Sequence, residues 1–436
     1  MPSQRGELLR ATVFHTPRSP FRTERALEGH ADGALLVVDG RIVESGDYRR
    51  VRANHPDVVE TDLRGGFLLP GFIDTHVHFP QLRVIGSLGR SLLDWLEHSA
   101  LPEEARMADE SYADDTARKF VHALASHGTT TALVFGAHFA YATAALFDAA
   151  DLAGLRMISG LVTSDRYLRP ELLQTPEAAY RENAALIRKF HGRGRLRYAV
   201  TPRFALSASE AMLEVCRTLL SENPTVRFQT HINENHSEIR EVKKSFAWAA
   251  DYLAVYEHFG LCGDRAVLAH DVHPTDDELW RLAGTRTPIA HCPCSNAALA
   301  SGIFPMKRHI DAGVHFALGT DVGGGTGFGM LKEGLQAYMM QRVVPDGMVL
   351  KPAHLLYLAT RAGAEALGLG HETGDFDNGK AADLVYLKPP DGSPLAAVVE
   401  RAEDPERILA ALFTLAGQES VREVRVAGST VYKAAV

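Results

Sequence analysis

Short runs of apolar residues recur through the middle of the chain, and most of them lack the alternation of apolar and polar side chains that marks a half-exposed strand. Parallel strands that are buried on both faces have this pattern. The pattern therefore predicts eight buried strands, at residues 70–78, 129–136, 156–163, 197–203, 227–232, 266–270, 287–292 and 315–320.

Helix-like stretches separate these runs, at residues 140–153, 176–190, 207–221, 276–283 and 329–343. Several of them open with a helix-capping signal, for example Ser207-Ala-Ser-Glu210, in which a serine precedes a glutamate by three positions. Eight successive strand–helix units predict an α/β fold, a (β/α)8 TIM-type barrel, with a doubly wound open sheet as the alternative. A further helical segment is expected after the barrel, at about residues 352–368.

The two ends of the chain have a different, strand-rich pattern. The run 34–38 is followed by Asp39-Gly40, which favours a hairpin turn, and then by the strand-like run 41–45. Runs 382–387 and 421–426 are also strand-like, and a turn is expected at 427–431. We therefore predict a small β-sandwich domain from residues 1–68 plus 375–436, and a barrel from residues 69–374.

Composition narrows the classes of function. The 436 residues carry 46 Lys and Arg against 54 Asp and Glu, a net charge of −8, and no long basic run, which argues against nucleic acid as a partner. No uncharged apolar run approaches the roughly 20 residues that a membrane helix needs, so no membrane partner is expected. The first residues lack an apolar signal core. Four cysteines (Cys216, Cys262, Cys292 and Cys294) are too few for a disulfide framework, and a cytoplasmic location is expected.

Titratable residues stand at the ends of the predicted strands. His76 and His78 end the first, His231 the fifth and His270 the sixth, and Asp321 follows the eighth. The carboxyl ends of barrel strands meet at one face, where active sites of such barrels lie. Imidazole and carboxylate ligands suit zinc, and a catalytic zinc keeps one position open for water. The set therefore predicts a metal site.

These residues resemble a known family. Pro70-Gly-Phe-Ile-Asp-Thr-His-Val-His78 is similar to the signature of the amidohydrolase superfamily, and Thr230-His231, Leu268-Ala-His270 and Gly319-Thr-Asp321 match its later positions. Two-metal members carry a bridging lysine on strand four, which this chain lacks at 198–204. The resemblance therefore implies one Zn²⁺ per chain, held by His76, His78, His231 and Asp321, as in the ring deaminases of this superfamily.

Three further segments resemble the members of this subtype that act on guanine: Pro80-Gln81, Thr201-Pro-Arg-Phe204, and Leu93-Asp-Trp-Leu-Glu97 with Pro102 beyond. The resemblance implies hydrolysis of this small-molecule purine to xanthine and ammonia, and a homodimer. It assigns proton transfer to Glu234, three positions after His231, with His270 and Asp321 as the other catalytic groups. Substrate-binding roles fall to Gln81, Trp95, Arg203 and Phe204.

Alternatives stay open at this point. Another ring deaminase of the same subtype, acting on a pterin, an adenine or a thio-adenosine, is the nearer one, and a non-enzymatic barrel is the further one. Arg203, which the resemblance assigns to substrate binding, could instead form an ion pair at the surface. His291 is expected to support the site by hydrogen bonding, and Gly323 to Gly325 are expected to form a flexible loop beside Asp321.

Overall fold

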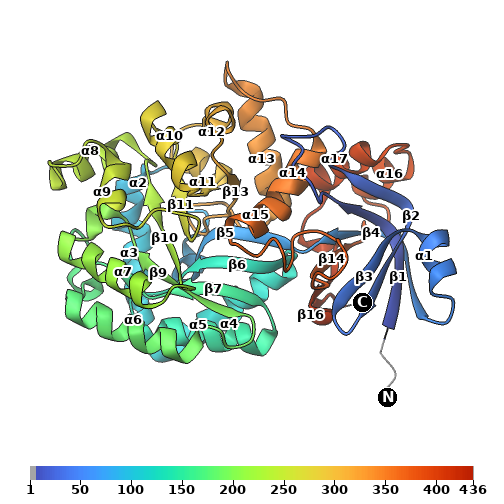
Figure 1. Ribbon diagram of the computed structural model, residues 1–436, viewed down its shortest axis with the longest axis horizontal. Helices are drawn as coiled ribbons and strands as arrows, with labels where there is room; N and C mark the ends of the chain where they lie inside the picture. Colours follow the sequence, from blue (N-terminus) through green and yellow to red (C-terminus); the bar gives the residue numbers. More distant parts are fainter. Residues whose placement is uncertain (1–5, 436) are drawn as a thin grey trace.

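The structure, a computed structural model, describes residues 6–435. Residues 1–5, on which the expectation of no signal core partly rests, lie outside the described residues, as does residue 436. Figure 1 shows a barrel with helices around it and, beside it, a separate sheet that contains both ends of the chain. Among the described residues, no helix is both long enough and apolar enough to cross a membrane.

Eight parallel strands form the nearly closed barrel, which confirms the predicted fold class. They follow one another around the barrel in sequence order, and the short β8 (Val162–Thr163) pairs with β9 off this path. The eight strands are β5 (Phe72–His78), β6 (Thr129–Phe135), β7 (Arg156–Gly160), β9 (Leu196–Pro202), β10 (Arg227–Ile232), β11 (Ala266–His270), β12 (Ile289–His291) and β13 (Phe316–Leu318).

The barrel closes through hydrogen bonds between β5 and the segment that follows β13. The backbone N–H of His78 donates to the carbonyl of Val322 at 2.9 Å, and that of Asp321 donates to the carbonyl of His76 at 2.8 Å. These bonds attach Asp321 to the strand that carries the histidine pair.

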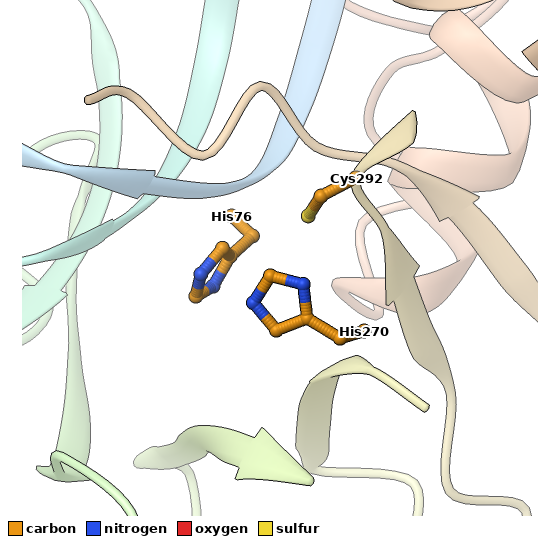
Figure 2. A group of neighbouring side chains, drawn as sticks. All are labelled: His76, His270 and Cys292. Carbon is orange, nitrogen blue, oxygen red and sulfur yellow. The ribbon is translucent and has the colours of Figure 1, made fainter. Parts of the chain in front are cut away.

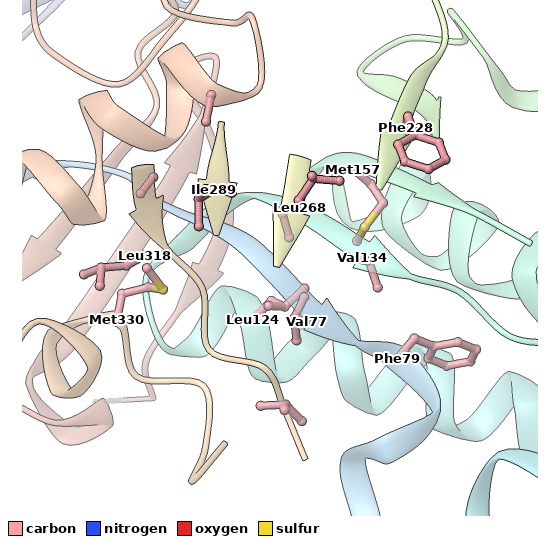
Figure 3. Close-up of a cluster of buried hydrophobic side chains, with 14 of the residues drawn as sticks. Val77, Phe79, Leu124, Val134, Met157, Phe228, Leu268, Ile289, Leu318 and Met330 are labelled. Atoms are coloured by element: carbon pink, nitrogen blue, oxygen red, sulfur yellow. The ribbon is translucent and has the colours of Figure 1, made fainter. Parts of the chain in front are cut away.

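Apolar side chains from the strands and the outer helices form one continuous core. Figure 3 shows part of it, with Val77, Val134 and Leu268 from the strands and Leu124 from α4. Apart from Arg197 and Arg227, the residues of these strands are buried, which explains why their sequences show no alternation.

The helices follow the strands in the predicted order. Before β10 they are α2 (Leu92–Trp95), α3 (Leu101–Ala105), α4 (Glu110–Ser126), α5 (Ala140–Ala153), α6 (Pro176–Phe190) and α7 (Glu210–Glu222). After β10 they are α8 (His236–Ser245), α9 (Tyr252–His258), α10 (Asp276–Thr285), α11 (Pro293–Ala298), α12 (Met306–Ala312), α13 (Met330–Val343), α14 (Pro352–Ala359) and α15 (Arg361–Ala366).

Two expectations about helices need correction. The helix expected from residue 207 begins at Glu210, because Ser209, not Ser207, is the N-cap whose hydroxyl accepts from the backbone N–H of Met212. The segment expected as one helix at 352–368 is two helices, because the backbone leaves helical geometry at Thr360.

The terminal sheet has seven strands in the order β16-β15-β14-β4-β1-β2-β3, and all its neighbours are antiparallel except β1 and β4. The strands are β1 (Gly6–His15), β2 (Glu28–Val38), β3 (Arg41–Asp47), β4 (Val59–Pro70), β14 (Leu384–Leu387), β15 (Val421–Val426) and β16 (Ser429–Lys433). The predicted hairpin turns lie between β2 and β3 and between β15 and β16. Helices α1 (Tyr48–Asn54), α16 (Pro394–Glu400) and α17 (Pro405–Leu415) belong to these parts of the chain. The domain division at residues 68 and 375 stays a prediction.

Candidate active site

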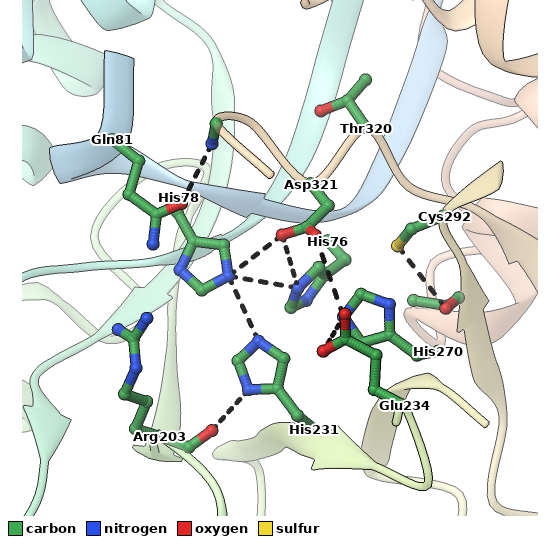
Figure 4. A network of polar contacts seen from close by, with 12 residues as sticks. His76, His78, Gln81, Arg203, His231, Glu234, His270, Cys292, Thr320 and Asp321 are labelled. Atoms are coloured by element: carbon green, nitrogen blue, oxygen red, sulfur yellow. Dashed lines mark hydrogen bonds and ion pairs between the residues drawn. The ribbon is translucent and has the colours of Figure 1, made fainter. Parts of the chain in front are cut away.

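The barrel brings the residues predicted as metal ligands to one place. His76 and His78 lie at the end of β5, His231 is the penultimate residue of β10, and Asp321 lies three residues after β13. Figure 4 shows the three imidazoles and the carboxylate pointing toward one another, with Gln81 and Arg203 on one side and Glu234 and His270 on the other.

The distances within this group fit a shared cation. His78 Nε2 lies 3.2 Å from each of three atoms: His76 Nε2, His231 Nε2 and Asp321 Oδ1. His76 Nε2 is also 3.2 Å from Asp321 Oδ1. A ring nitrogen carries at most one proton, so hydrogen bonding cannot satisfy all these contacts together. Ligand atoms about 2.0–2.1 Å from one tetrahedral ion lie roughly 3.3 Å from each other, which matches the arrangement.

The protonation of the group also suits a cation. Burial lowers the pKa of His78 to about 4 and lowers the pKa values of His76 and His231, so all three rings are neutral. Nδ1 of His231 is 2.5 Å from the carbonyl oxygen of Arg203 and donates to it, which leaves Nε2 free to bind. Burial alone would raise the pKa of Asp321, but His76 and His78 hold it well below its usual range.

Glu234 and His270 lie next to this group. His270 Nδ1 is 2.9 Å from Asn296 Oδ1, and its Nε2 has no hydrogen-bond partner among the described residues. That Nε2 lies 3.5 Å from Glu234 Oε2 and 3.9 Å from Asp321 Oδ2. Glu234 accepts a hydrogen bond from the hydroxyl of Ser301 at 3.0 Å. Burial, with the nearby charge of Asp321, raises the pKa of Glu234 to about 8, so this acid keeps its proton at neutral pH.

A second set of potential ligands, His76, His270 and Cys292, shares one histidine with the first (Figure 2). Burial raises the pKa of the Cys292 thiol well above its usual range. Metals bind the thiolate, not the thiol. This set is therefore a much weaker metal site than the group around His78.

A cavity opens on the group from the carboxyl ends of the strands. Its wall contains all four residues predicted to bind substrate, Gln81, Trp95, Arg203 and Phe204, together with Leu92, Leu96 and Leu299. His78, His231, Glu234, His270 and Asp321 also line it. The cavity thus has an apolar part, a donor-bearing part and the titratable group.

The sequence of the chain matches a known protein family. The model of the amidohydrolase family matches residues 67–431. The chain belongs to the amidohydrolase family.

The similarity of this amidohydrolase to its relatives covers nearly the whole chain. It is 57% identical over 432 residues to a probable guanine deaminase of Deinococcus radiodurans, with 98% of each chain covered. It is 38% identical over 425 residues to a guanine deaminase of Escherichia coli K12, covering 97% of this chain and 96% of the relative. The solved structure of an E. coli guanine deaminase superposes with a TM-score of 0.93 over 99% of both chains, at 36% identity.

Glu104, a buried polar residue behind the cavity, is absent from the residues predicted for the site. Arg203 is not at the surface. It is 3% exposed, and its Nη1 donates to both carboxylate oxygens of Glu104, at 2.6 and 2.7 Å. Gln81 Nε2 donates to Glu104 at 2.8 Å, and His138 Nε2 lies 3.2 Å from it. Pro102 was the nearest sequence signal, but two adjacent glutamates after a proline are typical of a solvated helix start.

Two further expectations need correction. The imidazole of His291 makes no hydrogen bond among the described residues; the ring stacks on Phe304 with centroids 4.3 Å apart. Gly323 to Gly325 are buried and closely packed, so their loop is not a flexible one. A Cβ added to Gly323 would lie 2.6 Å from the carbonyl oxygen of Gln81, and one on Gly324 would lie 3.0 Å from Asp321 Oδ2. Glycine is needed there for close approach.

Proposed function

We propose that this protein hydrolyses guanine to xanthine and ammonia with one bound zinc ion. The observation that carries the proposal is one cavity in which a buried histidine and carboxylate group and a protonated Glu234 face the donor groups of Arg203 and Gln81. Guanine deaminases as full-length relatives support the choice of substrate.

The metal would be held by His76, His78, His231 and Asp321, whose atoms lie at the mutual distances given above. When bound, zinc supplies the Lewis acidity that makes water a nucleophile near neutral pH. One ion is proposed because β9 (Leu196–Pro202) contains no lysine that could bridge a second.

The chain's own residues would handle the protons. In the reaction a water oxygen bonds to C2 of guanine, and the bond from C2 to the amino nitrogen breaks. Asp321, kept ionised by its histidine neighbours, takes the proton of the water. Glu234, which holds a proton at neutral pH, gives it to the ring nitrogen beside C2, then takes the remaining proton of the added oxygen and passes it to the leaving amine. The proton taken by Asp321 returns to Glu234 and completes the cycle. His270, whose Nε2 has no hydrogen-bond partner among the described residues, would contact the oxygen that adds to C2.

The rest of the cavity would orient the purine. The guanidinium of Arg203 donates to O6, and Gln81 contacts the neighbouring part of the ring edge. Phe204 and Trp95, 5% and 3% exposed, pack against the ring faces. A planar ring between aromatic and leucine side chains buries apolar surface on both faces.

We also propose a homodimer in the cytoplasm. The exposed apolar side chains of α13 and the loop beyond it, Tyr338, Met339, Val343 and Val349, support a contact between copies. The four cysteines are all free, as is usual in a reducing compartment. Light scattering of the purified protein and fractionation of cells test these two points.

The decisive experiment measures ammonia release from guanine, adenine, pterin and their nucleosides, with metal content determined on the same preparation. We expect release from guanine far above all others. Preferred turnover of adenine, a pterin or a nucleoside would replace guanine as the substrate, and a zinc-loaded protein without turnover on any of them would refute the proposal.

A further inference from the structure

Glu104 stands behind the part of the cavity wall that carries Gln81 and Arg203, and does not itself line the cavity. It is 2% exposed, in α3 (Leu101–Ala105). Its carboxylate receives Arg203 Nη1 at 2.6 and 2.7 Å and Gln81 Nε2 at 2.8 Å. One buried carboxylate therefore accepts hydrogen bonds from both side chains that are proposed to donate to the purine.

Glu104 acts there as an acceptor alone. Burial by itself would raise its pKa, but the charge of Arg203 and the contact with His138 hold the pKa well below its usual range. An ionised carboxylate has only acceptor sites, so each neighbour must turn a donor toward it.

This fixes the orientation of Gln81. Its Nε2 faces Glu104, and its Oε1 accepts the backbone N–H of Gly323 at 3.0 Å. The loop at Gly323 thus binds one lone pair of the side-chain oxygen and holds this oxygen on the loop side, and Nε2 keeps a second N–H for a ligand. Arg203 has no acceptor at all. The wall made by these two residues therefore presents mainly donors to the cavity.

We propose that Glu104 is a positioning residue that selects purines with an oxygen at position 6 over those with an amino group there. Guanine presents two adjacent acceptors, O6 and N7, whereas a 6-amino purine presents a donor beside N7. A wall of donors pairs with the first edge and leaves unpaired donors against the second. The inference rests on the proposed function, because it assumes that a purine occupies this cavity.

The test compares guanine with 2,6-diaminopurine, which keeps the 2-amino group, carries an amino group in place of O6 and has no hydrogen on N1. We would measure kcat/KM for loss of the 2-amino group in the zinc-loaded parent and in Glu104→Gln. Chromatography quantifies the products, which are xanthine from guanine and isoguanine from 2,6-diaminopurine. The amide can turn a donor or an acceptor toward Gln81, so Gln81 is no longer fixed. We expect the preference for guanine to narrow by roughly 10- to 100-fold. An equal loss on both substrates would show a purely structural role and overturn the proposal.

Two further variants keep the outcome interpretable. Glu104→Asp retains the anion and should retain the parent's preference even where kcat/KM falls; if Glu104→Gln does not fold, a preference lost in folded Glu104→Asp overturns the proposal. Glu103→Gln changes the neighbouring residue, which accepts from Tyr112 and Arg106 outside the cavity, and should leave the preference unchanged. A parent inactive on guanine would refute the proposed function, whereas an active parent whose preference ignores Glu104→Gln would refute only the role of Glu104.

Discussion

His78 Nε2 and His231 Nε2 lie 3.2 Å apart, although 153 positions separate the two residues in the chain. Both rings are buried and neutral. Two lone pairs directed at one point are unfavourable unless a proton or a cation lies between them. His76 and Asp321 approach the same point. A cation bound by all four side chains would therefore remove the repulsion between their lone pairs.

We expect about one zinc ion per chain in the purified protein. Removing it with a chelator should abolish ammonia release, and adding zinc should restore it. The melting temperature should fall on chelation, because an ion that binds only the folded state stabilises that state. Elemental analysis and thermal melting check this. Two tightly held ions per chain, or full activity after complete metal removal, would contradict the assignment.

Glu234→Gln should keep the fold and the zinc but lose about 10²- to 10⁴-fold in kcat, the usual worth of general acid–base catalysis. The amide fills the same space and can still contact Ser301, yet it cannot shuttle a proton. Steady-state kinetics and metal analysis on one preparation measure both effects. Near-normal turnover, or loss of zinc, would show that Glu234 has another role.

Glu333→Gln is the matched control for that variant. Glu333 is also a buried glutamate whose pKa burial raises to about 8, but it lies on α13 and accepts from the backbone N–H of Cys294 outside the cavity. The same change of acid to amide should therefore leave kcat and zinc content close to those of the parent. A comparable loss in this control would mean that the Glu234 result reports general damage to the barrel.

The sequence predicted most strands because burial on both faces leaves a direct mark on composition. The run expected at 129–136 is β6 (Thr129–Phe135), and the helix expected at 140–153 is α5 (Ala140–Ala153). Strand ends on a barrel face the same rim, so strand order alone placed the candidate ligands together. Short strands such as β12 (Ile289–His291) were overestimated, because apolar residues continue beyond the paired backbone.

Contacts made by single side chains across the barrel were beyond sequence reasoning. Glu104 and Arg203 are 99 positions apart, and nothing in either segment indicates that they form a buried pair. The orientation of Gln81 likewise depends on the backbone of Gly323, which only the folded loop brings near. The residue types predicted a site, but the pairing among them had to come from the structure.

Arg203→Ala should reduce guanine use and also destabilise the protein. Without the guanidinium, the Glu104 carboxylate stays buried without its principal counter-charge, a loss that typically costs about 3–5 kcal/mol. If Arg203 also donates to O6, kcat/KM should fall more for guanine than for 2-aminopurine, which has no O6. Denaturant unfolding and kinetics on both substrates separate the two effects. Equal kinetic losses would mean that Arg203 supports the cavity without reading O6.

The pH dependence of stability should carry a contribution from Glu333. This residue is 1% exposed, and its Oε1 has no hydrogen-bond partner among the described residues. Burial raises its pKa from 4.5 to about 8, so the folded protein keeps a proton that the unfolded chain releases at lower pH. The stabilisation that comes with the bound proton is complete below pH 4.5 and is lost as the pH rises to 8, at a slope of up to about 1.4 kcal/mol per pH unit. Glu333→Gln removes this titration.

The measurement is the free energy of unfolding in urea for the parent and Glu333→Gln at pH 5, 6, 7 and 8. Other titrating groups contribute equally to both proteins, so the difference between the two curves isolates this carboxyl group. We expect the free energy of unfolding of the variant, relative to that of the parent, to increase steadily as the pH rises. The difference should be largest at pH 8, on the order of a few kcal/mol. Parallel curves would mean that Glu333 titrates near its ordinary pKa in the folded state. If the free energy of unfolding of the parent instead increases relative to that of the variant as the pH rises, the pKa of Glu333 is lowered in the folded state. A cation near the carboxylate would then outweigh the effect of burial.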